Sequence, residues 1–185
     1  MKGALLSEEQ EGLETILERA REGSREAFDQ LIRRFEKKVM KTALYLTRNL
    51  ADAQDVAQEV YIKIFRHLNS CEDEGKIDRW VYRITVNAAR DFLRRSRFRL
   101  PLRVLLPSFS PRDPVTREEF RSRLMESLAK LSFRERAAFI LRELQDLETS
   151  EVAEILGCGE VSVRGYLHSA RAKLQKSFRD KRYHP

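Results

Sequence analysis

The placement of the prolines is the feature that most constrains this fold. The chain has 185 residues with only five prolines and seven glycines, and four of the prolines fall in one short stretch, at Pro101, Pro107, Pro111 and Pro114. Proline removes a backbone donor and restricts the residue before it, so a long helix cannot run through this stretch. We therefore predict a linker over residues 100–115 with a separate lobe on either side.

The segments flanking this linker have the patterns of helices. Capping boxes, in which a hydroxyl and a carboxylate or amide bind the first free backbone donors, are predicted at Ser7–Gln10, Thr116–Glu119 and Ser132–Glu135. We expect four helices before the linker, near 8–22, 25–48, 52–68 and 77–97, and four after it, near 116–130, 133–146, 150–156 and 160–178. The predicted fold class is all-α, with two small helical domains joined by a flexible linker.

Composition limits the classes to which the chain can belong. Hydrophobic residues make up 42% of the sequence and charged residues 35%, which is too apolar for a disordered chain. No apolar stretch approaches the roughly 20 residues of a membrane span, and the N-terminus becomes charged too early for a secretory signal. Cys71 and Cys158 are too few for a disulfide framework. We expect a cytoplasmic protein with no membrane insertion; its net charge of +7 indicates a polyanionic partner only weakly.

The C-terminal segment has the pattern of a helix-turn-helix. A short predicted helix ends at Gly157, a tight turn follows, and Val163, Leu167, Ala170 and Leu174 then form the buried stripe of a longer helix. The other side of that helix presents the residues that we predict to contact duplex DNA in the major groove: Arg164, Gly165, His168, Ser169 and Arg171. An ordinary helical hairpin with a solvated polar face is the alternative.

The predicted helix at 52–68 has a mixed outer face. Asp55, Gln58, Glu59 and Ile62 lie opposite its buried stripe, so an isoleucine is ringed by acids and an amide. Such a surface is a candidate for protein docking. The alternative is a solvated face with one stray apolar residue.

The predicted helix at 77–97 has a basic outer face. Tyr82, Arg83, Asn87, Arg90 and Arg94 are expected there, with Trp80 at the start of the helix. Aromatic rings and guanidinium planes stack on bases while arginines follow phosphates, so this pattern favours single-stranded nucleic acid. For Trp80, a place in the core remains an equal alternative.

The order of these motifs resembles one family. The segments 52–65 and 80–95 resemble conserved region 2 of the group 4, or extracytoplasmic-function (ECF), bacterial sigma factors of the sigma-70 family. Residues 131–141 and the helix-turn-helix resemble their region 4. The resemblance divides the chain into an N-terminal extension helix (1–22), region 2 (23–99), a linker (100–115) and region 4 (116–185).

The resemblance also implies a function. A sigma factor binds core RNA polymerase and directs promoter-specific initiation, with no catalysis, cofactor or metal of its own. By resemblance, the face with Asp55, Gln58, Glu59 and Ile62 would dock on the clamp helices of the β′ subunit, with the β subunit as a further contact. The helix carrying Trp80 to Arg94 would hold the melted −10 element, and the last helix would bind the −35 element. An anti-sigma factor is the implied regulator.

Two other function classes remain as alternatives. An ordinary regulator with a helix-turn-helix would bind duplex DNA without polymerase, and the proposed docking and single-strand faces argue against it. An enzyme is disfavoured because the sequence has no metal-ligand spacing, phosphate-binding glycine loop or nucleophile motif.

Overall fold

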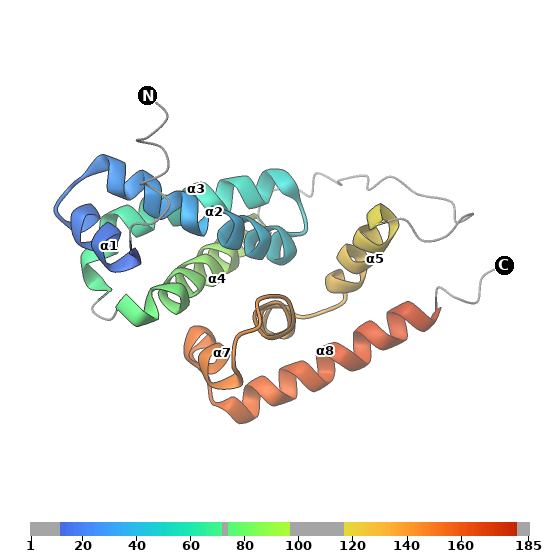
Figure 1. The fold of residues 1–185 in the computed structure, drawn as a ribbon. Helices are drawn as coiled ribbons and strands as arrows, with labels where there is room; N and C mark the ends of the chain where they lie inside the picture. The colour runs from blue at the N-terminus through green and yellow to red at the C-terminus, as the bar shows by residue number, and fades with distance from the viewer. Residues whose placement is uncertain (1–11, 72–73, 97–116, 181–185) are drawn as a thin grey trace.

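The computed structural model describes residues 12–71, 74–96 and 117–180, and its regular elements are helices throughout these ranges. The predicted linker at 100–115 lies outside the described residues. So do the predicted capping boxes at Ser7–Gln10 and Thr116–Glu119, in whole or in part. Figure 1 shows the helices before and after the linker as two groups, which confirms the predicted all-α, two-lobed fold class.

The N-terminal lobe consists of four α-helices and two short 3₁₀ turns. In order they are α1 (Leu13–Arg21), α2 (Arg25–Thr47), α3 (Leu50–His67), η2 (Leu68–Ser70), η3 (Glu74–Lys76) and α4 (Ile77–Ser96). Leu17, Leu31, Phe35, Val60 and Ile64 are fully buried between them. Burial of side chains of this size contributes about 1.5–3 kcal/mol each, so the interior of this bundle stabilises the lobe.

Local polar residues fix where these helices begin. The Ser24 hydroxyl accepts a hydrogen bond from the Ala27 amide at the start of α2, and the Asn49 side chain accepts one from the Asp52 amide at the start of α3. Such caps satisfy backbone donors that have no partner within the helix. Between the two helices, Arg48 adopts a left-handed φ of 64° and ends α2 sharply.

The C-terminal lobe contains the predicted helix-turn-helix. Its elements are α5 (Arg117–Ala129), α6 (Phe133–Phe139), the π-helical turn η4 (Ile140–Leu144), α7 (Thr149–Leu156) and α8 (Glu160–Asp180). The capping box at Ser132 and Glu135 is confirmed. Gly157 ends α7 with a φ of 61°, a left-handed conformation in which a side chain would be strained.

The helix predicted over 133–146 differs from the observed one. Its last turn widens into the π-helical η4, and the chain leaves helical geometry at Gln145. Asp146 then has a positive φ of 53°, which Asp tolerates better than most residues. Hydrophobic spacing alone cannot distinguish an α-helical last turn from a π-helical one, because both keep apolar residues on the inner side.

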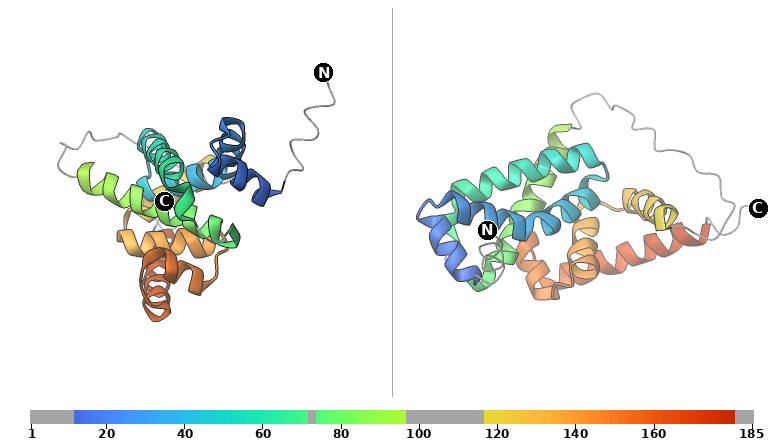
Figure 2. Two further views of the ribbon diagram at one scale, coloured as in Figure 1. Left: turned by 90° about the vertical axis from the view of Figure 1, so that its left-hand side faces the viewer. Right: turned by 45° about the horizontal axis from the view of Figure 1, so that its top comes forward.

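The two lobes pack against each other through α4. The views in Figures 1 and 2 place α4 between α2 and α3 on one side and the C-terminal helices on the other. Val81, Tyr82 and Val86 of α4 belong to the same continuous core as Leu141 and Val152 of the C-terminal lobe. The lobes therefore share apolar interior in addition to the connecting chain.

Arg136 of α6 is the central polar contact between the lobes. Its guanidinium donates to the Leu46 carbonyl of α2 at 2.6 Å and to the Leu128 and Leu131 carbonyls at 3.0 Å each. Burial, together with the nearby charge of Arg48, lowers the pKa of Arg136 to about 10. A buried charge is costly unless its donors are satisfied, and here carbonyl oxygens from both lobes satisfy them.

Candidate protein- and DNA-binding surfaces

The predicted docking face of α3 is open to solvent. We call Asp55, Gln58, Glu59 and Ile62 the docking stripe. Asp55 and Gln58 are exposed, and Ile62 keeps 51% of its surface accessible, so the expected exposure of these three is confirmed. A half-exposed isoleucine beside polar groups is typical of a protein-binding surface. This favours the docking interpretation over a solvated face with one stray apolar residue.

Glu59 is held more firmly than the rest of the docking stripe. It forms ion pairs with Lys63 at 2.8 Å and with Arg95 of α4 at 2.7 Å. Partial desolvation raises the pKa of Glu59, but hydrogen bonds from Lys63 and Arg95 outweigh it and bring the pKa below its ordinary value. Glu59 is thus ionised and fixed at the junction of α3 and α4.

The α3 helix has two large exposed apolar residues besides Ile62. Phe65 is 69% exposed one helical turn after Ile62, and Leu50 is 56% exposed at the start of α3. The Phe65 and Phe28 rings form a T-shaped pair between α3 and α2, with ring centroids 5.1 Å apart and planes at 80°. The i, i+3 spacing from Ile62 was a signal that could have identified Phe65.

The basic face of α4 is only partly as predicted. Arg83, Arg90 and Arg94 are exposed and Asn87 is half-buried, which places these four along one helical stripe. Trp80 is half-buried and packs against the apolar core, so it has both a buried and an accessible part. We call Arg83, Asn87, Arg90 and Arg94 the basic stripe.

Tyr82 does not lie on this open face, and its predicted exposure is wrong. It is only 4% exposed, and its hydroxyl donates to Gln145 Oε1 of the C-terminal lobe at 3.2 Å. Burial and the negative charge of Asp78 raise the pKa of Tyr82 to about 12. Val86, one helical turn further along α4, is also buried, at 2% exposed. The cause is the second lobe, which covers a flank of α4 that would be open in an isolated helix bundle.

Arg79 lies beside Tyr82 under the same cover. Its guanidinium is within 3.5 Å of Glu151 and 3.8 Å of Glu154, both on α7. A cavity of about 320 Å³ remains at this junction, lined by Lys38, Asp78, Arg79 and Tyr82 on one lobe and by Gln145, Asp146 and Glu151 on the other.

The predicted DNA-binding side of α8 is exposed over most of its length. Arg164, Gly165, His168 and Arg171 are accessible. A Cβ at Gly165 would meet no atom within 4 Å, so the fold does not require glycine there. Val161, which the sequence analysis did not select, is 78% exposed on the same side. Arg164 pairs with Glu160 at 3.3 Å and Arg171 with Glu143 at 2.5 Å, and DNA phosphates would compete for both arginines.

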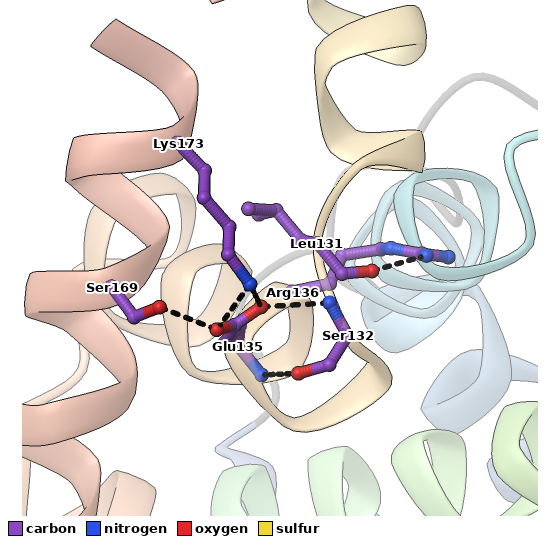
Figure 3. Close-up of polar contacts among 6 residues, drawn as sticks. All are labelled: Leu131, Ser132, Glu135, Arg136, Ser169 and Lys173. Atoms are coloured by element: carbon purple, nitrogen blue, oxygen red, sulfur yellow. Dashed lines mark hydrogen bonds and ion pairs between the residues drawn. The ribbon is translucent and has the colours of Figure 1, made fainter. Parts of the chain in front are cut away.

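Ser169 differs from the other predicted −35 contacts. It is half-buried, and its hydroxyl donates to Glu135 Oε1 at 2.5 Å. Lys173 of α8 contacts the same carboxylate at 2.7 and 2.8 Å, while Glu135 also caps α6 through Ser132 (Figure 3). Desolvation raises the pKa of Glu135, but the hydrogen bonds from Lys173, Ser169 and Ser132 outweigh this effect and lower the pKa to about 2. This carboxylate therefore fixes α8 on α6.

Residues 12–71, 74–96 and 117–180 contain neither a candidate metal-ligand cluster nor a candidate membrane span. Among those residues, no group of three or more His, Cys, Asp or Glu side chains could hold a metal ion. No helix in the same ranges has the length and apolar composition that a membrane span requires.

Comparison with known proteins covers both lobes. The Sigma-70 region 2 family matches residues 31–99, and the Sigma-70, region 4 family matches residues 121–174. The RNA polymerase sigma-H factor of Pseudomonas aeruginosa is 27% identical over 94% of this chain and 96% of its own. The ECF RNA polymerase sigma factor SigM of Mycobacterium tuberculosis is 30% identical over 83% of this chain and 78% of its own.

Solved structures agree with these matches. The structure of CnrH in complex with the cytosolic domain of CnrY has a TM-score of 0.68 and 25% identity, covering 90% of this chain and 96% of that one. The sigma factor RpoE from Bartonella quintana, solved with the anti-sigma factor NepR, has a TM-score of 0.67 at 21% identity, covers 82% of this chain and 96% of that one, and shares the fold. With two regions matched in order and a relative at 30% identity over most of both chains, this chain belongs to the ECF sigma factors of the sigma-70 family.

Proposed function

We propose that this sigma factor uses three separate surfaces to direct promoter-specific initiation. The docking stripe on α3 binds core RNA polymerase at the β′ clamp helices, with the β subunit as a further contact. The α4 helix holds the melted −10 element, and α8 binds the −35 element. Residues 1–22 form an N-terminal extension, 23–99 region 2, 100–115 a linker and 116–185 region 4.

The docking stripe has the chemistry of a protein contact. Ile62 offers apolar area at its centre, while Asp55 and Gln58 remain free in solvent to pair with polar groups of a partner. Apolar centres with polar rims are typical of protein interfaces. Phe65 lies on the same outer side and adds aromatic area of the kind that dominates binding energy.

The basic stripe on α4 fits single-stranded DNA. Three exposed arginines follow one side of the helix, with the Asn87 amide between Arg83 and Arg90. Guanidinium groups bind phosphates and stack on bases, and an amide can hydrogen-bond a base edge. In this proposal, Trp80 supplies an accessible aromatic surface for −10 bases, and Tyr82 supplies a second one once its contact with Gln145 is broken.

The α8 helix fits the major groove. Arg164 and Arg171 project from its open side on either side of Gly165 and His168. An arginine of this kind can bind guanine in a bidentate manner, and a glycine lets the helix backbone approach the DNA closely.

We assign this chain no reaction, no cofactor and a cytoplasmic location. We also propose regulation by an anti-sigma factor, because the similar chain CnrH was solved with the cytosolic domain of a second protein. Such a partner would cover the docking stripe or the DNA-binding faces.

The observation that carries this function is that most residues of the docking stripe and of the basic stripe are exposed on adjoining helices, α3 and α4, of the segment that matches sigma-70 region 2. The test is transcription from a promoter library by core polymerase with this chain. Gln58→Ala combined with Glu59→Ala should lower core affinity and transcription, while Asp29→Ala, an exposed acid on α2, should leave both unchanged. Absence of core binding, with tight binding to duplex DNA alone, would show an ordinary regulator instead.

A further inference from the structure

The C-terminal lobe covers Arg79 and Tyr82 of α4 with groups that resemble the chemistry of a DNA strand. Arg79 faces the carboxylates of Glu151 and Glu154, and Tyr82 is buried with its hydroxyl on the Gln145 amide. A single DNA strand offers chemically similar partners. Its phosphate oxygens could replace the carboxylates that face the Arg79 guanidinium, and its planar bases could replace the amide that contacts the Tyr82 phenol.

Hydrogen bonds within the C-terminal lobe and to α2 hold the covering residues in position. Glu151 Oε2 accepts from the Glu148 amide at 2.8 Å at the start of α7, while Oε1 faces Arg79. Glu154 follows at i+3 on the same side of α7. Gln145 is tied by its amide to Thr42 Oγ1 of α2 at 3.1 Å. Gln145, Glu151 and Glu154 thus face region 2 together, and we call these three residues the α7 edge.

Arg79 remains incompletely satisfied under this cover. Its side chain is 21% exposed, and its Nε is buried without a hydrogen-bond partner, because Glu154 lies 3.8 Å away. The adjoining cavity of about 320 Å³ shows that the two surfaces do not fit closely here. A loosely paired arginine beside a cavity can change to another anionic partner at low cost.

We infer that Arg79 and Tyr82 belong to the −10 strand site, and that the α7 edge and the single strand compete for them. In the arrangement described here, region 4 closes that part of the site. Binding of the strand requires the α7 edge to leave. The inference rests on the proposed function, because it needs α4 to be the −10 surface.

The competition between the α7 edge and the strand predicts how much the affinity for single-stranded DNA should change when the edge is weakened. When only a fraction of molecules is open, the apparent dissociation constant of the strand is raised by the inverse of that fraction. Partly exposed ion pairs contribute modestly, so neutralising both glutamates should raise the open fraction, and the affinity for the strand, by about 3- to 10-fold.

The test compares full-length variants in fluorescence anisotropy with a labelled, mixed-sequence single-stranded DNA of about 15 nucleotides. Glu151→Gln combined with Glu154→Gln removes two charges, while a glutamine at 151 can still cap α7. Glu14→Gln combined with Glu18→Gln makes the same change in net charge at exposed positions of α1. We expect tighter binding for the α7 pair, little change for the α1 pair, and loss of the gain when Arg79→Ala is added.

Hydrogen exchange supplies a second readout on the wild-type chain. Saturating single strand should speed exchange of amides in residues 145–156 as the α7 edge leaves. Equal affinity for the two double variants, or unchanged protection of 145–156 with strand bound, would overturn the competition. If these fail while wild type still transcribes with core polymerase, the proposed function stands; if wild type does not transcribe, both are wrong.

Discussion

Replacing Arg136 by methionine should destabilise the chain and loosen its two lobes. Hydrogen bonds to a charged group contribute about 1.5–3 kcal/mol each, so the three carbonyl contacts of Arg136 contribute about 4–9 kcal/mol. Against this, burial together with the nearby charge of Arg48 lowers the pKa of Arg136 to about 10, which corresponds to a cost on the order of 3 kcal/mol for the charged form. The net loss in the free energy of unfolding is therefore about 1–6 kcal/mol.

Urea unfolding followed by circular dichroism measures this loss, with Arg134→Met as the control. Arg134 lies on the same helix but is exposed, so its replacement should change stability by no more than about 0.5 kcal/mol. Small-angle scattering should also show a larger radius of gyration for Arg136→Met, because the contact to the Leu46 carbonyl joins the lobes. A loss below about 1 kcal/mol, with unchanged dimensions, would refute the argument that this guanidinium holds both lobes.

Three further predictions concern the C-terminal lobe. Arg164→Ala should cost about 1–3 kcal/mol at specific −35 duplexes if it binds a base, measured by competition binding; an equal loss on unrelated duplexes would mark a phosphate contact instead. Gly165→Ala should raise stability by about 0.5–1 kcal/mol, because the added Cβ meets nothing, and yet weaken −35 binding; unchanged binding would exclude close DNA approach at this position. Glu135→Gln should lower the free energy of unfolding at pH 7 by about 1–3 kcal/mol. Because the pKa of Glu135 falls to about 2 in the folded state from 4.5, wild type should lose this advantage as the pH falls through that interval, and a pH-independent difference would contradict the assignment.

Much of the fold was predictable from local sequence patterns. The bounds of α2, α4 and α8, the capping box at Ser132 and the break at Gly157 follow from hydrophobic spacing, hydroxyl caps and glycine conformation, all of which act over a few residues. The docking stripe was predictable for the same reason, since the exposure of Asp55, Gln58 and Ile62 depends mainly on the periodicity of α3.

The errors arose where distant segments meet. Tyr82 is buried by Gln145, which lies 63 residues further along the chain, and periodicity within α4 carries no information about that contact. Arg136 is another case, because arginine is mostly exposed, and its burial depends on the Leu46 carbonyl 90 residues earlier. Helical spacing predicted which residues would be exposed on the N-terminal lobe alone. The packing of the C-terminal lobe then buries some of those residues, and spacing cannot predict which.

The number of residues in the π-helical turn η4 determines where Leu144 and Gln145 lie, and therefore which contacts join the two lobes. A wider turn accommodates one residue more than an α-helical turn of the same rise. Leu144 therefore presents its carbonyl to Lys41 at 2.9 Å, and Gln145 reaches both Thr42 and Tyr82. Deleting one residue from η4 would restore α-helical winding and rotate the following chain by about 100°. Relatives whose α6 continues without such an insertion would have to join their two lobes through different side chains.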